Sequence, residues 1–183
     1  MKVLGISGSA RAASTNTALL QALARAASED TGILAKVDVW AGVADLPVFS
    51  PDREGDKTPP EVLHFANRIA TADALVVACP EYVHALPGGF KNAIDWLVSR
   101  QEIIGKPIAL LHASHRGADV LADLRRVLAT VSDGFRPEIF LQIPCGKMSP
   151  DEVRQHCATP DLTRQLTDFL TTLSKEIALS RPD

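Results

Sequence analysis

Three segments of the chain combine polar, charged or aromatic side chains with glycine or proline, and each directly follows an apolar run. They are Gly8 to Thr17 (G-S-A-R-A-A-S-T-N-T), Pro80 to Trp96 with the only tyrosine, Tyr82, and His112 to Gly117 (H-A-S-H-R-G). Hydroxyl, amide and guanidinium groups in the first segment suit an anion, and the aromatic ring in the second suits a flat ligand. We therefore examined all three as candidate parts of one site.

The first segment joins a predicted buried strand to a predicted helix start. Because the first N–H groups of a helix are unpaired and lie at the positive end of its dipole, this position favours a phosphate. The groups offered to it are Ser9, Arg11, Ser14, Thr15, Asn16 and Thr17. The same residues also fit an N-cap cluster with a solvated arginine, so this segment alone leaves both interpretations open. It matches neither G-x-G-x-x-G nor a P-loop, which disfavours a dinucleotide bound in the Rossmann manner.

Apolar strand patterns alternate with helical patterns along the whole chain. The predicted strands are Lys2–Ser7, Ala35–Trp40, Ala74–Cys79, Pro107–His112 and Glu138–Ile143. Helices are predicted from Thr15 to Glu29, from Pro60, from Gly89 to Arg100, around Leu121 to Val131 and around Leu162 to Ile177, with a loop from Pro47 to Pro60. This order predicts an α/β fold, a doubly wound five-stranded parallel sheet with helices on both faces, in one domain covering residues 1–183. Ligands of such sheets bind outside the carboxyl ends of the strands, where the three segments lie.

Several motifs taken together resemble the NAD(P)H-dependent FMN reductase family. They are Gly8 to Asn16, Pro80-Glu81-Tyr82, Pro87-Gly88 and Lys91-Asn92-Ala93-Ile94-Asp95-Trp96, in this order. The resemblance runs essentially end to end and implies a flavodoxin-like fold, a bound FMN and NADPH or NADH as co-substrate. It also implies a small-molecule electron acceptor (a quinone, free flavin, azo compound or metal oxyanion), a ping-pong cycle and a homodimer or homotetramer.

The resemblance also implies which residues bind the cofactor. The 5′-phosphate would be held by Ser9, Arg11, Ser14, Thr15, Asn16 and Thr17, and the isoalloxazine ring bordered by Pro80, Glu81, Tyr82 and Val83. Two departures stand out: many relatives carry Asn where this chain has Val83, and Gly117-Ala118 replaces a common glycine pair. Because the flavin carries the redox chemistry, no side chain is expected to act as catalytic acid or base.

The third segment is expected to meet the pyrimidine end of the flavin through Ser114 and the backbone to Gly117. Arg116 either stabilises the reduced flavin, pairs with nucleotide phosphates or is simply solvated. His84 either faces the substrate or caps the helix that follows it, and His115 receives no role.

Composition excludes other classes of protein. The chain has 19 basic and 22 acidic residues, a net charge of −3, which argues against a nucleic-acid or anionic-membrane binder. No apolar run approaches the roughly 18 residues of a membrane helix, and no signal peptide is expected, so we predict a cytoplasmic protein. The three cysteines are expected to be free thiols, with Cys79 packed in the core, and no metal site is predicted.

Two other functions remain open at this point. One is a flavodoxin-type electron carrier that never meets a nicotinamide, and the other is a non-catalytic FMN-binding module on the same fold. Bleaching of the flavin by NADPH separates the reductase from both. The sequence distinguishes neither NADH from NADPH nor one acceptor from another.

Overall fold

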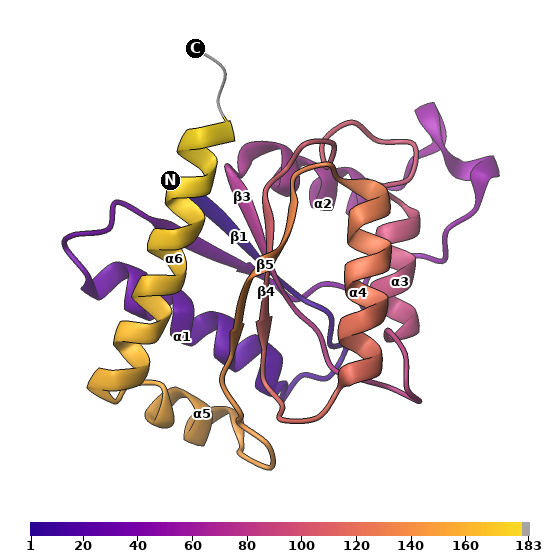
Figure 1. Ribbon diagram of the computed structural model, residues 1–183. Coiled ribbons are helices and arrows are strands. Elements are labelled where there is room, and N and C mark those ends of the chain that lie inside the picture. Colours follow the sequence, from indigo (N-terminus) through magenta and orange to yellow (C-terminus); the bar gives the residue numbers. More distant parts are fainter. Residues whose placement is uncertain (181–183) are drawn as a thin grey trace.

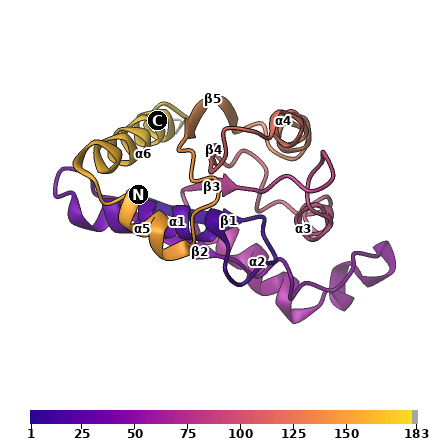
Figure 2. The ribbon, with the colours of Figure 1, turned by 90° about the horizontal axis from the view of Figure 1, so that it is seen from below.

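The computed structural model describes residues 1–180, so the last three residues of the predicted domain 1–183 lie outside it. Five parallel strands form one sheet in the order β2-β1-β3-β4-β5. Their bounds are β1 Lys2–Ser7, β2 Lys36–Trp40, β3 Ala74–Ala78, β4 Ile108–His112 and β5 Phe135–Gln142. The predicted doubly wound parallel sheet is confirmed (Figure 1), and its strand order, which can be followed in Figure 2, is that of flavodoxin-like folds.

Helices cover both faces of the sheet, as Figure 2 shows. Their bounds are α1 Thr15–Glu29, α2 Pro60–Thr71, α3 Gly88–Asp95, α4 Ala118–Val131, α5 Pro150–His156 and α6 Pro160–Ser180. One core lies between the sheet and α1, α5 and α6, and the other between the sheet and α2, α3 and α4. Strands β3 and β4 are buried at every residue because both faces are covered, which explains why β3 is wholly apolar and β4 is apolar up to its last residue, His112.

Two regions differ most from the sequence prediction: the edge strand β5 and the loop from Pro47 to Pro60. Strand β5 begins at Phe135, three residues earlier than predicted, although Pro137 lies inside it. An edge strand tolerates a proline, and the pairing with β4 shifts here, from Ile108 opposite Phe135 to Leu110 opposite Phe140. The predicted loop from Pro47 to Pro60 contains two short 3-10 turns, Pro51–Arg53 and Gly55–Lys57.

Two helix predictions need correction. Helix α5 was not predicted, although Ser149 and Glu152 form a capping box at its start. Helix α3 ends at Asp95, and not at Arg100, since the chain turns at Trp96. The Trp96 side chain is only 2% exposed, and its Nε1 donates to the Pro47 carbonyl at 2.7 Å. This tryptophan therefore packs inside its own chain and is not presented to a partner subunit.

Candidate functional site

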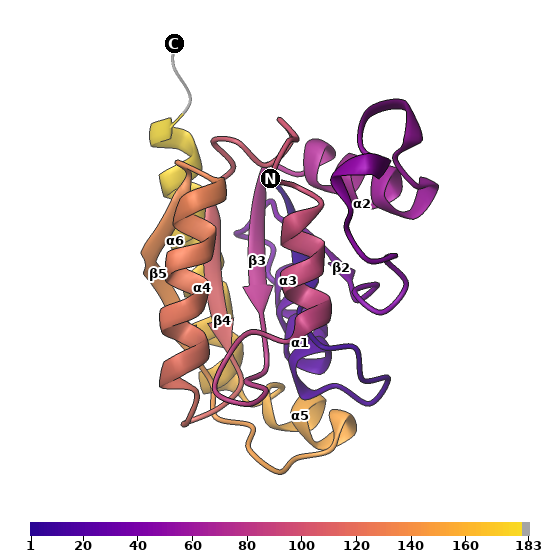
Figure 3. The same cartoon turned by 90° about the vertical axis from the view of Figure 1, so that its right-hand side faces the viewer.

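The three candidate segments meet at the carboxyl edge of the sheet, at the lower end of the molecule in Figure 3. They follow β1, β3 and β4, which are neighbours in the sheet. The Gly8 amide donates to the Ala78 carbonyl at 2.8 Å and so joins the first segment to the end of β3. The connection leaving β1 leads to β2 on one side, and the connection leaving β3 leads to β4 on the other. Ligands of doubly wound sheets bind at this switch point between β1 and β3.

Hydrogen bonds of serine and threonine hydroxyls order the backbone of the first segment. Ser7, fully buried at the end of β1, has its Oγ 2.8 Å from Thr17 Oγ1, and the Ser9 amide donates to the same Oγ at 3.4 Å. Ser9 Oγ in turn accepts from the Arg11 amide at 3.2 Å. The Arg11 residue itself is exposed at the mouth of this bend. The bend is therefore ordered by its own hydroxyls, with one guanidinium available to solvent or a ligand.

The start of α1 provides the amide groups that the sequence suggested. Ser14 is the N-cap, and its Oγ accepts from the Thr17 amide at 3.2 Å. Thr15 and Asn16 occupy the first turn, where backbone N–H groups have no partner within the helix. Asn16 is only 8% exposed, and its Oδ1 has no hydrogen-bond partner among the described residues. A buried amide without a partner costs free energy unless a ligand or water satisfies it.

The second segment makes a tight turn over the edge of β3. Tyr82 and Ala85 exchange two backbone hydrogen bonds of 3.1 Å, and the residues between them, Val83 and His84, have φ angles of 53° and 57°. Residues other than glycine rarely adopt this left-handed conformation; asparagine, aspartate and histidine do so more often, whereas a β-branched valine is an outlier there. Val83 is 95% exposed and Tyr82 45% exposed, so the turn presents both side chains outward.

Glu81 links this turn to the third segment. Its Oε2 accepts a hydrogen bond of 3.1 Å from the backbone amide of Val120, in the first turn of α4. The N-cap of α4 is Gly117, which has no side chain that could accept a hydrogen bond from the first turn of the helix. The carboxylate of Glu81 thus caps a helix that begins 37 residues later in the chain.

The third segment is fixed by a buried histidine. His112, 3% exposed, has its Nε2 2.7 Å from the Arg116 carbonyl, and because a carbonyl only accepts, Nε2 carries the hydrogen. Gly117 follows with a φ of 102°, and a Cβ there would lie 3.0 Å from the His112 ring. The Ser114 hydroxyl accepts from the Arg116 amide at 3.0 Å, while the Arg116 residue is exposed.

Two residues near the site, Gly8 and Cys79, pack closely against each other and take no part in the chemistry. A Cβ on Gly8 would lie 2.4 Å from Cys79 Sγ, so this position accepts only glycine without movement. Burial raises the pKa of the Cys79 thiol well above its usual range, so the thiol stays protonated. The predicted core role of Cys79 is confirmed, and all three cysteines are free and buried.

A second concavity lies away from this edge, between residues 54–58 and 96–102. It has a volume of about 550 Å³ and contains none of the predicted cofactor residues. Its charged side chains include Arg100 and Glu102, which pair with each other. We therefore retain the three-loop edge as the candidate site.

Sequence analysis missed the residues that hold the loops in place. They are Ser7, His112, Glu81 in its capping role and Gln142, whose Nε2 donates to the Ser114 carbonyl at 2.5 Å. The partners of Glu81 and Gln142 lie 39 and 28 residues away in the sequence, whereas those of Ser7 and His112 lie only 10 and 4 residues away. His84 does not cap the helix that follows it, because the N-cap of α3 is Pro87 and no side chain hydrogen-bonds there. Instead, His84 Nδ1 lies 2.7 Å from Asp119 Oδ2. A buried serine or histidine at a strand end was the available signal for Ser7 and His112.

Comparison with known proteins identifies relatives of this chain. Residues 1–141 match the family model described as NADPH-dependent FMN reductase. The chain is 41% identical to an NAD(P)H-dependent FMN reductase of Pseudomonas aeruginosa over 120 residues, which cover 62% of this chain and 60% of that protein. It is 31% identical to a quinone reductase of Escherichia coli over 179 residues, covering 92% of this chain and 93% of that protein.

Solved structures show the same fold. A flavoenzyme NAD(P)H:(acceptor) oxidoreductase of Paracoccus denitrificans superimposes with a TM-score of 0.69 at 24% identity, covering 96% of this chain and 98% of that one. An azoreductase of Bacillus anthracis superimposes with a TM-score of 0.57 at 15% identity, covering 98% of each chain. At these identities the likeness establishes the flavodoxin-like architecture.

Proposed function

The chain belongs to the NADPH-dependent FMN reductase family and is an oxidoreductase that uses FMN and NAD(P)H, and from this premise we propose that it passes electrons to a small acceptor of the quinone class. We propose that the two half-reactions follow a ping-pong cycle. The observation that carries the proposal is the meeting of three loops at the switch point of the sheet, with a buried, unpartnered amide at its base. When bound there, FMN supplies the two-electron redox chemistry. The acceptor class is suggested by the relatives named as quinone reductases.

The residues of the first loop fit a phosphate dianion. We assign phosphate binding to Ser9, Arg11, Ser14, Thr15, Asn16 and Thr17, as the sequence predicted. The unpartnered Oδ1 of Asn16 supports this, because a half-turn of the amide group brings its NH₂ to the same place, where it donates to a phosphate oxygen. Thr17 would act through Ser7, since its hydroxyl is already 2.8 Å from that residue.

The second and third loops fit a flat ring. We assign the borders of the isoalloxazine to Pro80, Glu81, Tyr82 and Val83, and its pyrimidine end to Ser114, Arg116 and Gly117. Tyr82 offers a half-exposed aromatic face, and Glu81 holds the turn against α4. The exposed guanidinium of Arg116 supports a role in attracting negative charge, either of the reduced ring or of the nicotinamide nucleotide.

The ping-pong proposal follows from the exposure of this edge. The turn at Tyr82 and Val83 is open to solvent, which leaves one shared face for the nicotinamide and for the acceptor in turn. Steady-state rates with NADPH and a benzoquinone are expected to give parallel double-reciprocal lines. Intersecting lines would contradict the cycle. Equal rates with quinones, azo dyes, chromate and free flavin would contradict the assignment to quinones.

Two further properties belong to the same proposal. The chain is expected to form a homodimer or homotetramer, so light scattering should give at least twice the 19.6 kDa of one chain. A mass of one chain would overturn this. No helix among residues 1–180 is long and apolar enough to cross a membrane, and we propose that the protein works in the cytoplasm without nucleic-acid partners.

A further inference from the structure

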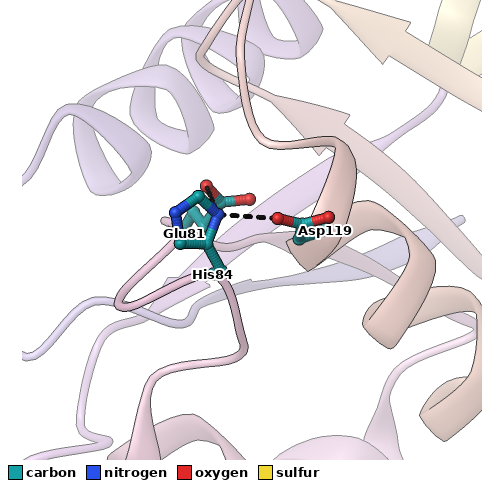
Figure 4. A group of neighbouring side chains, drawn as sticks. All are labelled: Glu81, His84 and Asp119. Atoms are coloured by element: carbon teal, nitrogen blue, oxygen red, sulfur yellow. Dashed lines mark hydrogen bonds and ion pairs between the residues drawn. The ribbon is translucent and has the colours of Figure 1, made fainter.

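One histidine and two carboxylates converge at the rim of the candidate site. Glu81 and His84 come from the turn after β3, and Asp119 comes from the first turn of α4 (Figure 4). His84 Nδ1 lies 2.7 Å from Asp119 Oδ2 and 3.9 Å from Glu81 Oε1. One ligand atom from each residue lies within 4.8 Å of the other two.

Backbone contacts position Glu81 and the turn that carries His84. His84 sits at a φ of 57° in the turn closed by the Tyr82–Ala85 hydrogen bonds, and this fixes the direction of its Cα–Cβ bond. Glu81 Oε2 is held by the Val120 amide, so its Oε1 remains for another partner. A hydrogen bond to the second oxygen is the kind of support that orients a ligating carboxylate.

The chemistry of the set is that of a divalent transition metal. An imidazole nitrogen with two carboxylate oxygens resembles three-ligand sites in which water completes the coordination. Two carboxylates and a neutral imidazole give a net charge of −2, which attracts a dication. Imidazole favours zinc-like ions over magnesium and calcium, which prefer oxygen alone.

The geometry requires only small side-chain movements to accept an ion. Bonds of about 2.0–2.2 Å place the ligand atoms of a tetrahedral site roughly 3–3.5 Å apart, between the two spacings seen from His84 Nδ1. The side chains of His84 and Asp119 are 83% and 57% exposed, so they can rotate and an ion can reach them. In the absence of an ion, the His84–Asp119 hydrogen bond satisfies both groups.

We propose that Glu81, His84 and Asp119 form a binding site for a divalent transition metal of the zinc type. The sequence prediction of no metal site would then be wrong. The third ligand, Asp119, lies 35 residues beyond His84 in the sequence, and only the folded sheet brings the two side chains together. A bound ion would clamp the β3–α3 turn to the start of α4, across the edge where the flavin ring is proposed to lie. The site stands on this side-chain cluster alone and does not depend on the proposed acceptor.

The test is a zinc titration of the full, FMN-loaded chain by calorimetry. One Zn²⁺ per chain is expected, and Mg²⁺ at the same concentrations should give no heat of binding. His84→Ala and Asp119→Asn should each weaken the zinc affinity by at least about tenfold. Glu81→Gln should also weaken it, although the amide oxygen can still accept from Val120. The matched control is His64→Ala, which removes another exposed histidine on α2 and should leave the affinity unchanged.

A second measurement locates the ion. A crystal soaked in zinc should give an anomalous peak within about 2.2 Å of His84 Nδ1. Zinc affinity that survives His84→Ala, a peak elsewhere, or no binding by the folded protein would each overturn the proposal. Circular dichroism of each variant confirms that the loss of binding is not a loss of fold.

Discussion

At the scale of single residues, the first loop carries one positive charge, that of Arg11, beside the proposed phosphate site. Arg11 is exposed, whereas its hydroxyl neighbours Ser9 and Ser14 are buried and already hydrogen-bonded. A guanidinium pairs with phosphate oxygens through charge-assisted hydrogen bonds. Its contribution should therefore depend on the phosphate and not on the ring.

Arg11→Ala is expected to weaken FMN binding by about tenfold, equivalent to about 1.4 kcal/mol. The affinity for riboflavin, which lacks the phosphate, should not change. Quenching of flavin fluorescence measures both affinities, and Arg53→Ala, another exposed arginine, is the control. An equal loss for FMN and riboflavin would show that Arg11 acts on the ring or on the fold.

Gly8 is expected to be intolerant of any side chain. A Cβ there would meet Cys79 Sγ at 2.4 Å, and overpacking of this kind costs about 1–3 kcal/mol in unfolding free energy. The double variant Gly8→Ala/Cys79→Ala should recover part of the loss, because the sulfur is gone but the Cβ of residue 79 remains 3.0 Å away and Phe90 Cγ 3.2 Å away. Urea unfolding measures the coupling between the two sites. Strictly additive effects would contradict the clash.

Glu102 gives the chain a pH-dependent contribution to stability. Hydrogen bonding to Arg100 holds the pKa of Glu102 below its ordinary value. A lowered pKa stabilises the fold above the ordinary range of a glutamate, and this contribution is lost as pH falls through the lowered value. The urea midpoint of the wild type should exceed that of Glu102→Gln at about pH 7, and the difference should shrink between about pH 5 and 3. A difference independent of pH would rule out this ion pair as its source.

At the scale of elements, Glu81 acts as the missing N-cap of α4. Glu81→Ala should lower the unfolding free energy by about 1 kcal/mol, because the Val120 amide loses its acceptor. Glu81→Gln should restore most of this loss, since its amide oxygen still accepts. Urea unfolding of the two variants makes the comparison. If Gln is as damaging as Ala, the charge and not the hydrogen bond supports α4.

The sequence predicted the elements whose signals are local. Strand β3 is apolar throughout and β4 is apolar up to His112, and the helical spacing of Leu20, Leu23, Ala24 and Ala27 indicates α1. Helix α5 was missed because seven residues carry little periodicity, although the Ser149–Glu152 capping box was visible. The predicted end of α3 is wrong because Leu97 continues the helical spacing of Phe90, Ala93 and Ile94, whereas the helix ends before Trp96, whose Nε1 donates to the Pro47 carbonyl 49 residues away.

The same division holds for the site. The residue types of the three loops and their place at the carboxyl edge follow from the order of strands and helices. The contacts from Glu81 to Val120 and from His84 to Asp119 depend on how the loops fold over one another. No spacing in the sequence predicts such contacts, because each depends on backbone turns such as the left-handed pair Val83-His84.

At the scale of the whole molecule, the sheet order explains why one edge carries the chemistry. Strands β1, β3 and β4 are adjacent and parallel, so the loops that follow them converge. The helices on both faces bury the sheet between two apolar cores, and the three loops lie beyond the carboxyl ends of its strands. The fold thus positions the site, and the loops determine what it binds.

The visible absorbance of the FMN-loaded protein under argon is the most direct test of this account. Addition of NADPH or NADH should bleach the flavin absorbance, and subsequent addition of a benzoquinone should restore it. A protein that takes up no FMN would contradict the assigned cofactor site. A protein that binds FMN but keeps its absorbance unchanged by both nicotinamides would contradict the proposed electron transfer.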